Sequence, residues 1–144
     1  MLPLTITDAA PLIRAGRLSP VDLTEAALAA IEKENSRLNA FLTVTAEAAR
    51  QDARRAEQEI RRGRWRGPLH GIPLSFKDLF WTRGVRTTGG SLILRDFVPS
   101  TDAPAVKRLK DAGAVLLGKT TLHEWAYGVT NNNQIGRASC RERV

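Results

Sequence analysis

The sequence has little cysteine, few aromatic residues and no long apolar run. A single cysteine, Cys140, excludes an internal disulfide and leaves no zinc-type cluster. No apolar run approaches the roughly 18 residues that a membrane span requires. Residues 1–16 also lack the basic segment and apolar core of a secretory signal. These absences predict a cytoplasmic protein that does not bind membranes and needs no metal or other cofactor.

Basic residues outnumber acidic ones, 22 to 15, which gives a formal net charge of +7. Such a charge permits binding to nucleic acids. In residues 50–66, however, Asp52, Glu57 and Glu59 interleave with the arginines, as on a solvated helix face. No zinc finger, aromatic interleaving or glycine-rich RNA-binding motif accompanies the charge. We therefore expect no specific nucleic-acid partner. The alternative from outside enzymology is a non-catalytic basic fragment that binds acidic partners.

The N-terminal part of the chain predicts two helices. Ser19 is a suitable N-cap and Pro20 a suitable first helical residue, and apolar residues recur at helical spacing over residues 20–34. Residues 46–62 predict a second helix, rich in alanine and charge. Residues 36–45 are interpreted as a connection between them.

The pattern changes after residue 67. Residues 72–80 and 114–120 are apolar and strand-like, and residues 103–112 between them have a short helical pattern. Residues 122–128 start another short helix. The order strand, loop, helix, strand is typical of an α/β unit and favours a parallel sheet. The predicted fold class is therefore α/β, with N-terminal helices before the sheet.

A lysine, Lys77, lies inside the apolar run GPLHGIPLSFKDLF. Strand alternation places Lys77 and Asp78 on opposite faces, which argues against an ion pair between them. The neighbours on the face of the lysine, Ser75 and Leu79, are not acids. Two interpretations stay open: an edge-strand residue that points to solvent, or a lysine whose proton affinity burial lowers, so that it acts as a base.

The two histidines are weak candidates. His70 lies in a glycine-flanked loop, and a lone histidine is more often structural than catalytic. His123 and Glu124 form half of a zinc-binding motif, but no second histidine follows at helical spacing. We interpret His123 and Glu124 as surface and cap residues. Residues 131–133, three asparagines, are expected to turn or cap the chain.

Three blocks in order resemble the amidase signature family, over residues 67–133. They are GPLHGIPLSFKDLF, GVRTTGGS and TDAPAVKRLKDAGAVLLGKTTLHEWAYGVTNNN. The resemblance implies a large mixed α/β sheet surrounded by helices. It also implies amide hydrolysis to an acid and ammonia or an amine, through a nucleophilic serine, a second serine in a cis peptide bond and a lysine. Lys77 occupies the position of that lysine. The residues that match the stretch lining the acyl pocket of the family are Tyr127, Gly128, Val129 and Thr130.

The resemblance divides the chain into three segments. Residues 1–66 are the N-terminal helical region, and residues 67–134 are a partial amidase signature core. Residues 135–144 look like a foreign tail, such as adapter sequence read in frame, because the family pattern is lost there.

Only the lysine of the family's triad is expected in this sequence. Ser75, Ser91 and Ser139 do not lie in the Gly-Gly-Ser-Ser context of the family. The isolated chain is therefore not expected to hydrolyse amides. An incomplete sheet is also expected to expose apolar surface and strand edges, which favours aggregation or partial folding.

Within the family, the main alternative is the A subunit of a tRNA-dependent amidotransferase, which releases ammonia from glutamine. The block HEWAYGVTNNN resembles the general amidase branch better than the Met-Gly-Ser-Ser-Thr-Glu-Asn pattern of that subunit. The expected ligand is a small-molecule amide, and the two N-terminal helices are a candidate dimer surface for the full-length protein.

Overall fold

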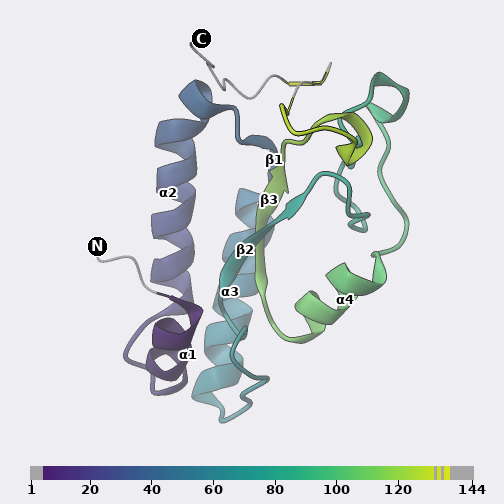
Figure 1. Ribbon diagram of the computed structural model, residues 1–144. Coiled ribbons are helices and arrows are strands. Elements are labelled where there is room, and N and C mark those ends of the chain that lie inside the picture. The colour runs from purple at the N-terminus through teal and green to yellow at the C-terminus, as the bar shows by residue number, and fades with distance from the viewer. Residues whose placement is uncertain (1–4, 132, 134, 137–144) are drawn as a thin grey trace. The chain divides into compact units, whose positions relative to one another are not determined.

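The computed structural model describes residues 5–131, 133, 135 and 136, and its elements form a mixed α/β fold, as predicted (Figure 1). In chain order they are α1 (Ile6–Arg14), α2 (Pro20–Leu38), β1 (Phe41–Val44), α3 (Ala46–Arg61), β2 (Pro73–Lys77), the 3-10 helix η1 (Leu92–Leu94), α4 (Pro104–Asp111), β3 (Val115–Thr120) and the 3-10 helix η2 (Glu124–Ala126).

The chain divides into two compact units that each combine separate stretches of sequence. Unit 1 contains Met1–Ala29, Thr45–Leu74 and Lys107–Leu117, and unit 2 contains Ala30–Val44, Ser75–Val106 and Gly118–Val144. Each unit is described by itself below.

The two predicted helices are confirmed as α2 and α3. The hydroxyl of Ser19 accepts hydrogen bonds from the backbone N–H groups of Val21 (3.1 Å) and Asp22 (3.3 Å), so Ser19 is the predicted N-cap. The prediction of only two helices before the strands was wrong, because α1 precedes them. Pro11 lies inside this helix, and proline normally disfavours a helix interior. The start of the helix is stabilised by a reciprocal capping box between Thr5 and Asp8.

The described strands form one sheet in the order β1-β3-β2. β1 pairs antiparallel with β3, with Phe41 opposite Thr120 and Val44 opposite Gly118. Hydrogen bonds beside β2 and β3 join Ile72 to Val115 and, further along, Asp78 to Thr120. Residue numbers therefore increase in the same direction along both strands, which makes these strands parallel. The predicted parallel arrangement is confirmed for β2 and β3, whereas the antiparallel β1 makes the sheet mixed.

The interpretation of residues 36–45 as a connection alone was wrong, because β1 lies there. A strand of four residues is too short for its alternating pattern to be distinguished from the sequence of a loop. Gly118 allows the pairing, because a Cβ atom at this position would clash with the carbonyl oxygen of Thr43.

Unit 1 has its core between the first helix and the chain that leads into β2. Ala9, Ile13 and Ile72 are buried together, and Leu18, Leu23, Ile60 and Trp65 pack against them. In the same unit, α2 and α3 are joined by an ion pair between Glu25 and Arg50 (2.8 Å) and by a hydrogen bond from Ser19 to Glu57 (2.6 Å).

His70 is a buried structural residue of unit 1. Only 1% of it is exposed, and its Nδ1 atom accepts a hydrogen bond from the backbone N–H of Arg66 (3.2 Å). Its Nε2 atom lies 3.2 Å from a carboxylate oxygen of Glu59. Burial lowers the pKa of His70, and this effect exceeds the opposing attraction of Glu59. The structural interpretation of His70 fits this environment.

The stability of the chain should therefore fall at mildly acidic pH. In the unfolded chain His70 takes up a proton near its ordinary pKa of 6.5, whereas in the folded chain its lowered pKa delays protonation to lower pH. The unfolded state then binds more protons, so the free energy of unfolding decreases as the pH falls below 6.5. The lowered pKa of Glu59, caused first by its hydrogen bond to Arg66, acts in the same direction below 4.5.

Urea denaturation of wild type and His70→Gln at several pH values measures this effect. His70→Gln should lack the decrease in stability that begins below pH 6.5, whereas His123→Gln, at the other histidine, should keep it. Equal pH dependence in wild type and His70→Gln would contradict the assignment.

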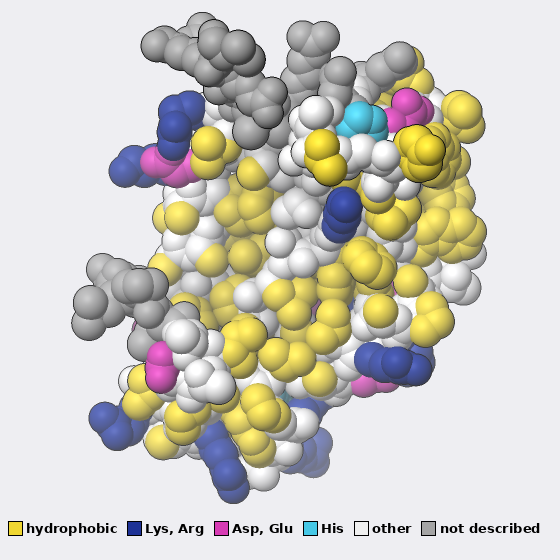
Figure 2. Space-filling view, in the orientation of Figure 1, with side chains coloured by type: hydrophobic (Ala, Val, Ile, Leu, Met, Phe, Trp, Pro, Cys, Tyr) yellow, Lys and Arg dark blue, Asp and Glu magenta, His cyan; other side chains and the backbone are white. Residues whose placement is uncertain are grey.

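Unit 2 exposes large apolar side chains, as expected. Figure 2 shows hydrophobic side chains spread over the face in view. Among the described residues of this unit, the most exposed large apolar ones are Trp81 (50%), Ile93 (83%), Val98 (52%), Tyr127 (93%) and Val129 (99%).

Candidate active site around Lys77

Lys77 is the last residue of β2, and its side chain is exposed. Burial alternates along this segment: Phe76 and Asp78 are buried, whereas Ser75, Lys77 and Leu79 are exposed. The prediction that Lys77 and Asp78 face opposite ways is confirmed. In the part of the chain that the structure describes, no hydrogen bond or ion pair involves the amine of Lys77. The side chain of Phe76 is buried (6% exposed), on the face of the strand opposite to the exposed Lys77.

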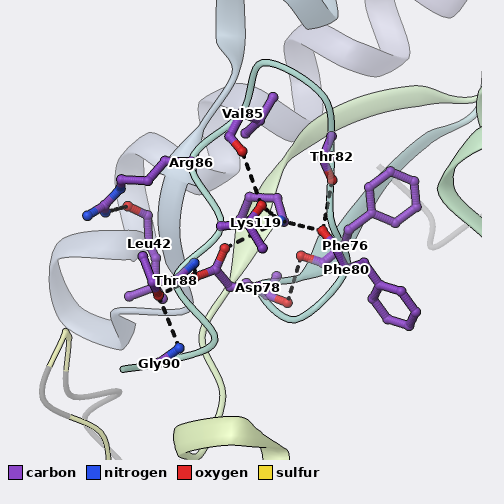
Figure 3. Close-up of polar contacts among 12 residues, drawn as sticks. Leu42, Phe76, Asp78, Phe80, Thr82, Val85, Arg86, Thr88, Gly90 and Lys119 are labelled. Atoms are coloured by element: carbon purple, nitrogen blue, oxygen red, sulfur yellow. Dashed lines mark hydrogen bonds and ion pairs between the residues drawn. The ribbon is translucent and has the colours of Figure 1, made fainter. Parts of the chain in front are cut away.

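The carboxylate of Asp78 is fixed beneath the end of β2. Asp78 is 1% exposed, and its Oδ2 atom accepts hydrogen bonds from the backbone N–H (2.9 Å) and the hydroxyl (2.5 Å) of Thr88. Its Oδ1 atom lies 3.4 Å from Nζ of Lys119. The hydroxyl of Thr88 in turn accepts a hydrogen bond from the N–H of Gly90 (3.0 Å). Figure 3 shows these contacts converging on Asp78.

Lys119, on β3, is the buried lysine of this site. It is 0% exposed, and its Nζ atom donates to the carbonyl oxygen of Phe80 (2.8 Å; Figure 3). The same atom donates to the hydroxyl of Thr87 (2.6 Å). The ammonium group of Lys119 thus has Phe80, Thr87 and the carboxylate of Asp78 as partners. A buried ammonium group needs such partners, because its desolvation is costly.

Sequence reasoning missed Lys119. The signal was the one that singled out Lys77: a lysine in an apolar run, here AVLLGKT. The charged amine of a lysine in such a run must either reach solvent or contact polar partners, and the two lysines differ in this respect. Lys77 reaches solvent, whereas Lys119 is buried with partners.

The glycines of the loop GVRTTGGS permit close packing by the segment around η2. The N–H of Trp125 donates to the carbonyl oxygen of Gly89 (2.7 Å), and a Cβ on Gly89 would lie 3.2 Å from the Trp125 ring. Asn133 holds the following segment: its amide donates to the carbonyl of Leu122, and its oxygen accepts from the N–H of Gly136 (2.8 Å). The expectation that the asparagines turn the chain is confirmed for Asn133.

The four candidate pocket residues follow η2 and are exposed. The side chains of Tyr127 and Val129 project into solvent, whereas the hydroxyl of Thr130 lies 3.1 Å from Nδ1 of His123. The ring of His123 also lies against Gly128, where a Cβ would be 2.5 Å from it. Within the described residues, no hydrogen bond or ion pair joins this stretch to Lys77.

Two further observations concern residues 5–131, 133, 135 and 136 only. No three acidic, histidine or cysteine side chains gather there as a metal site would require. None of the helices in this part is both long enough and apolar enough to span a bilayer.

The sequence model of the family described as Amidase matches residues 22–140, which is most of the chain. The chain belongs to the amidase signature family. The A subunit of the glutamyl-tRNA(Gln) amidotransferase of Streptomyces coelicolor is 44% identical over 133 residues, covering 92% of this chain and 27% of the relative. The protein of the same description from Rhodospirillum rubrum is 47% identical over 128 residues, covering 89% of this chain and 25% of the relative.

Solved structures of amidases have the same fold. The native peptide amidase from Stenotrophomonas maltophilia is 38% identical with a TM-score of 0.83, covering 93% of this chain and 30% of that one. A chain from a vestigial protein complex, solved in a study of the origins of an s-triazine catabolic enzyme, is 40% identical with a TM-score of 0.85. It covers 90% of this chain and 29% of that one. The chain thus spans about a quarter of the length of the curated relatives it matches.

Proposed function

We propose that residues 1–134 are the N-terminal part of an amidase that hydrolyses a carboxylic amide to an acid and ammonia or an amine. Lys77 is the catalytic lysine of this enzyme. The observation that supports the proposal is the placement of Lys77: its amine is exposed at the carboxyl end of β2, and its neighbour Asp78 is fixed in the protein. The carboxyl ends of strands in open α/β sheets are where ligands commonly bind.

The proposed chemistry is general-base activation of a serine nucleophile. The neutral amine of Lys77 takes a proton from a bridging serine, which takes one from the nucleophilic serine. The activated hydroxyl attacks the amide carbonyl, the proton returns from Lys77 through the bridging serine to the leaving nitrogen, and ammonia or an amine departs as the C–N bond breaks. Water then hydrolyses the acyl-enzyme to the acid and the free serine. Both serines belong to the remainder of the enzyme, because no serine of this sequence lies in a Gly-Gly-Ser-Ser context.

Residues 127–130 are proposed to line the acyl pocket. The exposed side chains of Tyr127 (93%) and Val129 (99%) are then covered by substrate or by the remainder of the protein. The contact between His123 and Thr130 fixes one end of this stretch. We further propose a cytoplasmic enzyme without a cofactor, and a foreign origin for residues 135–144.

The A subunit of a tRNA-dependent amidotransferase is the second candidate. The name of the curated relatives favours it. The block HEWAYGVTNNN and the names of the similar solved structures favour the amidase. Both candidates share the amide chemistry of Lys77 and differ in substrate and in dependence on partner subunits.

Sequencing the source DNA downstream of codon 130 is the first test. A following stretch that encodes a Gly-Gly-Ser-Ser motif supports the proposal, and a natural gene without one overturns it. The full-length protein is then assayed for hydrolysis of simple amides and for ammonia release from glutamine, with and without the partner subunits of an amidotransferase. Glutamine hydrolysis that needs the partners would favour the second candidate. The isolated 144-residue chain, which we expect to be inactive, serves as the reference.

A further inference from the structure

We propose that Asp78, Lys119 and Thr88 are positioning residues that hold the backbone on the C-terminal side of Lys77. This inference rests on the proposed function of Lys77 as catalytic base. None of the three is a catalytic residue: each is buried, and each would act on the reaction only through the placement of Lys77.

The first observation is a turn that begins at Lys77. The carbonyl oxygen of Lys77 accepts a hydrogen bond from the N–H of Phe80 (3.0 Å). The carbonyl oxygen of Phe80 accepts from Nζ of Lys119 (2.8 Å) and from the hydroxyl of Thr82 (3.0 Å). Lys119 therefore holds the far end of the turn whose first residue is the proposed base.

The second observation is that the backbone of Asp78 is anchored on both sides. Its N–H donates to the carbonyl oxygen of Thr120 (2.9 Å), and its carbonyl oxygen accepts from the N–H of Gly89 (2.9 Å). Asp78 thus ties the end of β2 to β3 and to the glycine-containing loop. Because Lys77 precedes Asp78 directly, this anchoring fixes where the lysine side chain leaves the strand.

The third observation is that the side chains of Asp78 and Thr88 lock the same loop. Two hydrogen bonds from Thr88, one from its backbone and one from its hydroxyl, meet a single carboxylate oxygen of Asp78. The hydroxyl donates its one proton to Asp78 and accepts from Gly90, so both its donor and an acceptor position are used. Loss of this hydroxyl alone would loosen the loop without removing a charge.

A contribution to folding stability does not by itself explain why a charged pair, Asp78 and Lys119, is buried here. Well-packed apolar side chains usually stabilise a core as well as a buried ion pair does, because desolvation of the two charges offsets their attraction. A buried pair does define geometry, since its partners are directional. General-base catalysis requires such definition, because a displacement of about 1 Å can lower a rate about 100-fold.

The test compares Thr88→Val with Thr88→Ser in the full-length protein. Valine has nearly the shape of threonine but no hydroxyl, whereas serine keeps the hydroxyl. Thr88→Val should lower kcat about 10- to 100-fold and should change KM by a smaller factor, because Thr88 holds Asp78 directly but reaches the proposed pocket segment only through Gly89 and Trp125. Thr88→Ser should keep kcat within about threefold.

Thr24→Val is the matched control, because Thr24 is also fully buried and its hydroxyl has no hydrogen-bond partner among the described residues. It should leave kcat and KM unchanged. Equal kcat in Thr88→Val and wild type, with Lys77→Met inactive, overturns the positioning role and leaves the proposed function standing. Activity of Lys77→Met overturns the proposed function itself.

A second measurement uses the full-length protein and needs no activity. Acetic anhydride acetylates exposed amines, and mass spectrometry reads the rate at each lysine. Lys119 (0% exposed) should react far more slowly than Lys33, whose side chain is 81% exposed. Thr88→Val should speed acetylation of Lys119, whereas Thr88→Ser and Thr24→Val should not. Equal rates at Lys119 and Lys33 in the unaltered full-length protein would overturn the proposal.

Discussion

In the full-length enzyme, Lys77→Met is expected to lower kcat about 10²- to 10⁴-fold, the usual contribution of a positioned general base. Methionine keeps the length and apolar stem of lysine but cannot accept a proton. The exposure of Lys77 and the absence of any described ion pair at its amine mean that the change removes little structure. Steady-state hydrolysis of an amide, with circular dichroism to check folding, measures the effect.

Two variants sharpen this result. Lys77→Arg should not restore turnover, because a guanidinium group stays protonated under working conditions. Lys107→Met changes another exposed lysine, one on α4 that pairs with Asp111 (2.6 Å), and should leave kcat within about twofold of wild type. Turnover by Lys77→Met at the rate of Lys107→Met would remove Lys77 from the mechanism.

The local features of the site were predictable from the sequence. Alternation along the strand correctly placed Lys77 and Asp78 on opposite faces, since it depends only on neighbouring residues. The cap at Ser19 was predictable for the same reason. In contrast, α1 and β1 were missed, because Pro11 disfavours a helix locally and a four-residue strand depends on its pairing with β3.

The partners of Asp78 were not predictable, because they come from distant parts of the chain. Thr88 belongs to a loop and Lys119 to a parallel neighbouring strand, and only the folded sheet brings them together. Sequence reasoning treated Lys119 as one residue of an apolar strand. The resemblance matched Lys77 to the lysine of the family, but it carried no information about what holds the end of β2. The sequence predicted a strand as far as residue 80, whereas β2 ends at Lys77.

Lys119→Met is expected to destabilise the folded state by about 3–5 kcal/mol, the usual cost of leaving one charge of a buried pair without its partner. Asp78 is 1% exposed, so water cannot solvate its carboxylate once the ammonium is gone. Lys33→Met, at an exposed lysine 4.0 Å from Glu34, should change the free energy of unfolding by no more than about 0.5 kcal/mol. Pulse proteolysis in urea measures both at protein concentrations low enough to limit aggregation.

The double variant Asp78→Asn with Lys119→Met separates the ion pair from the packing. Asparagine keeps an oxygen that can accept the hydrogen bonds of Thr88, and the double variant has no unpaired charge. Its destabilisation should therefore be smaller than the sum of the two single changes by about 2 kcal/mol. Additive effects would mean that Asp78 and Lys119 act independently, and their 3.4 Å approach would then be a contact without energetic coupling. A coupling of the expected size would instead mean that Asp78 and Lys119 stabilise the fold as a pair, although burying them removes two charges from water next to the proposed base.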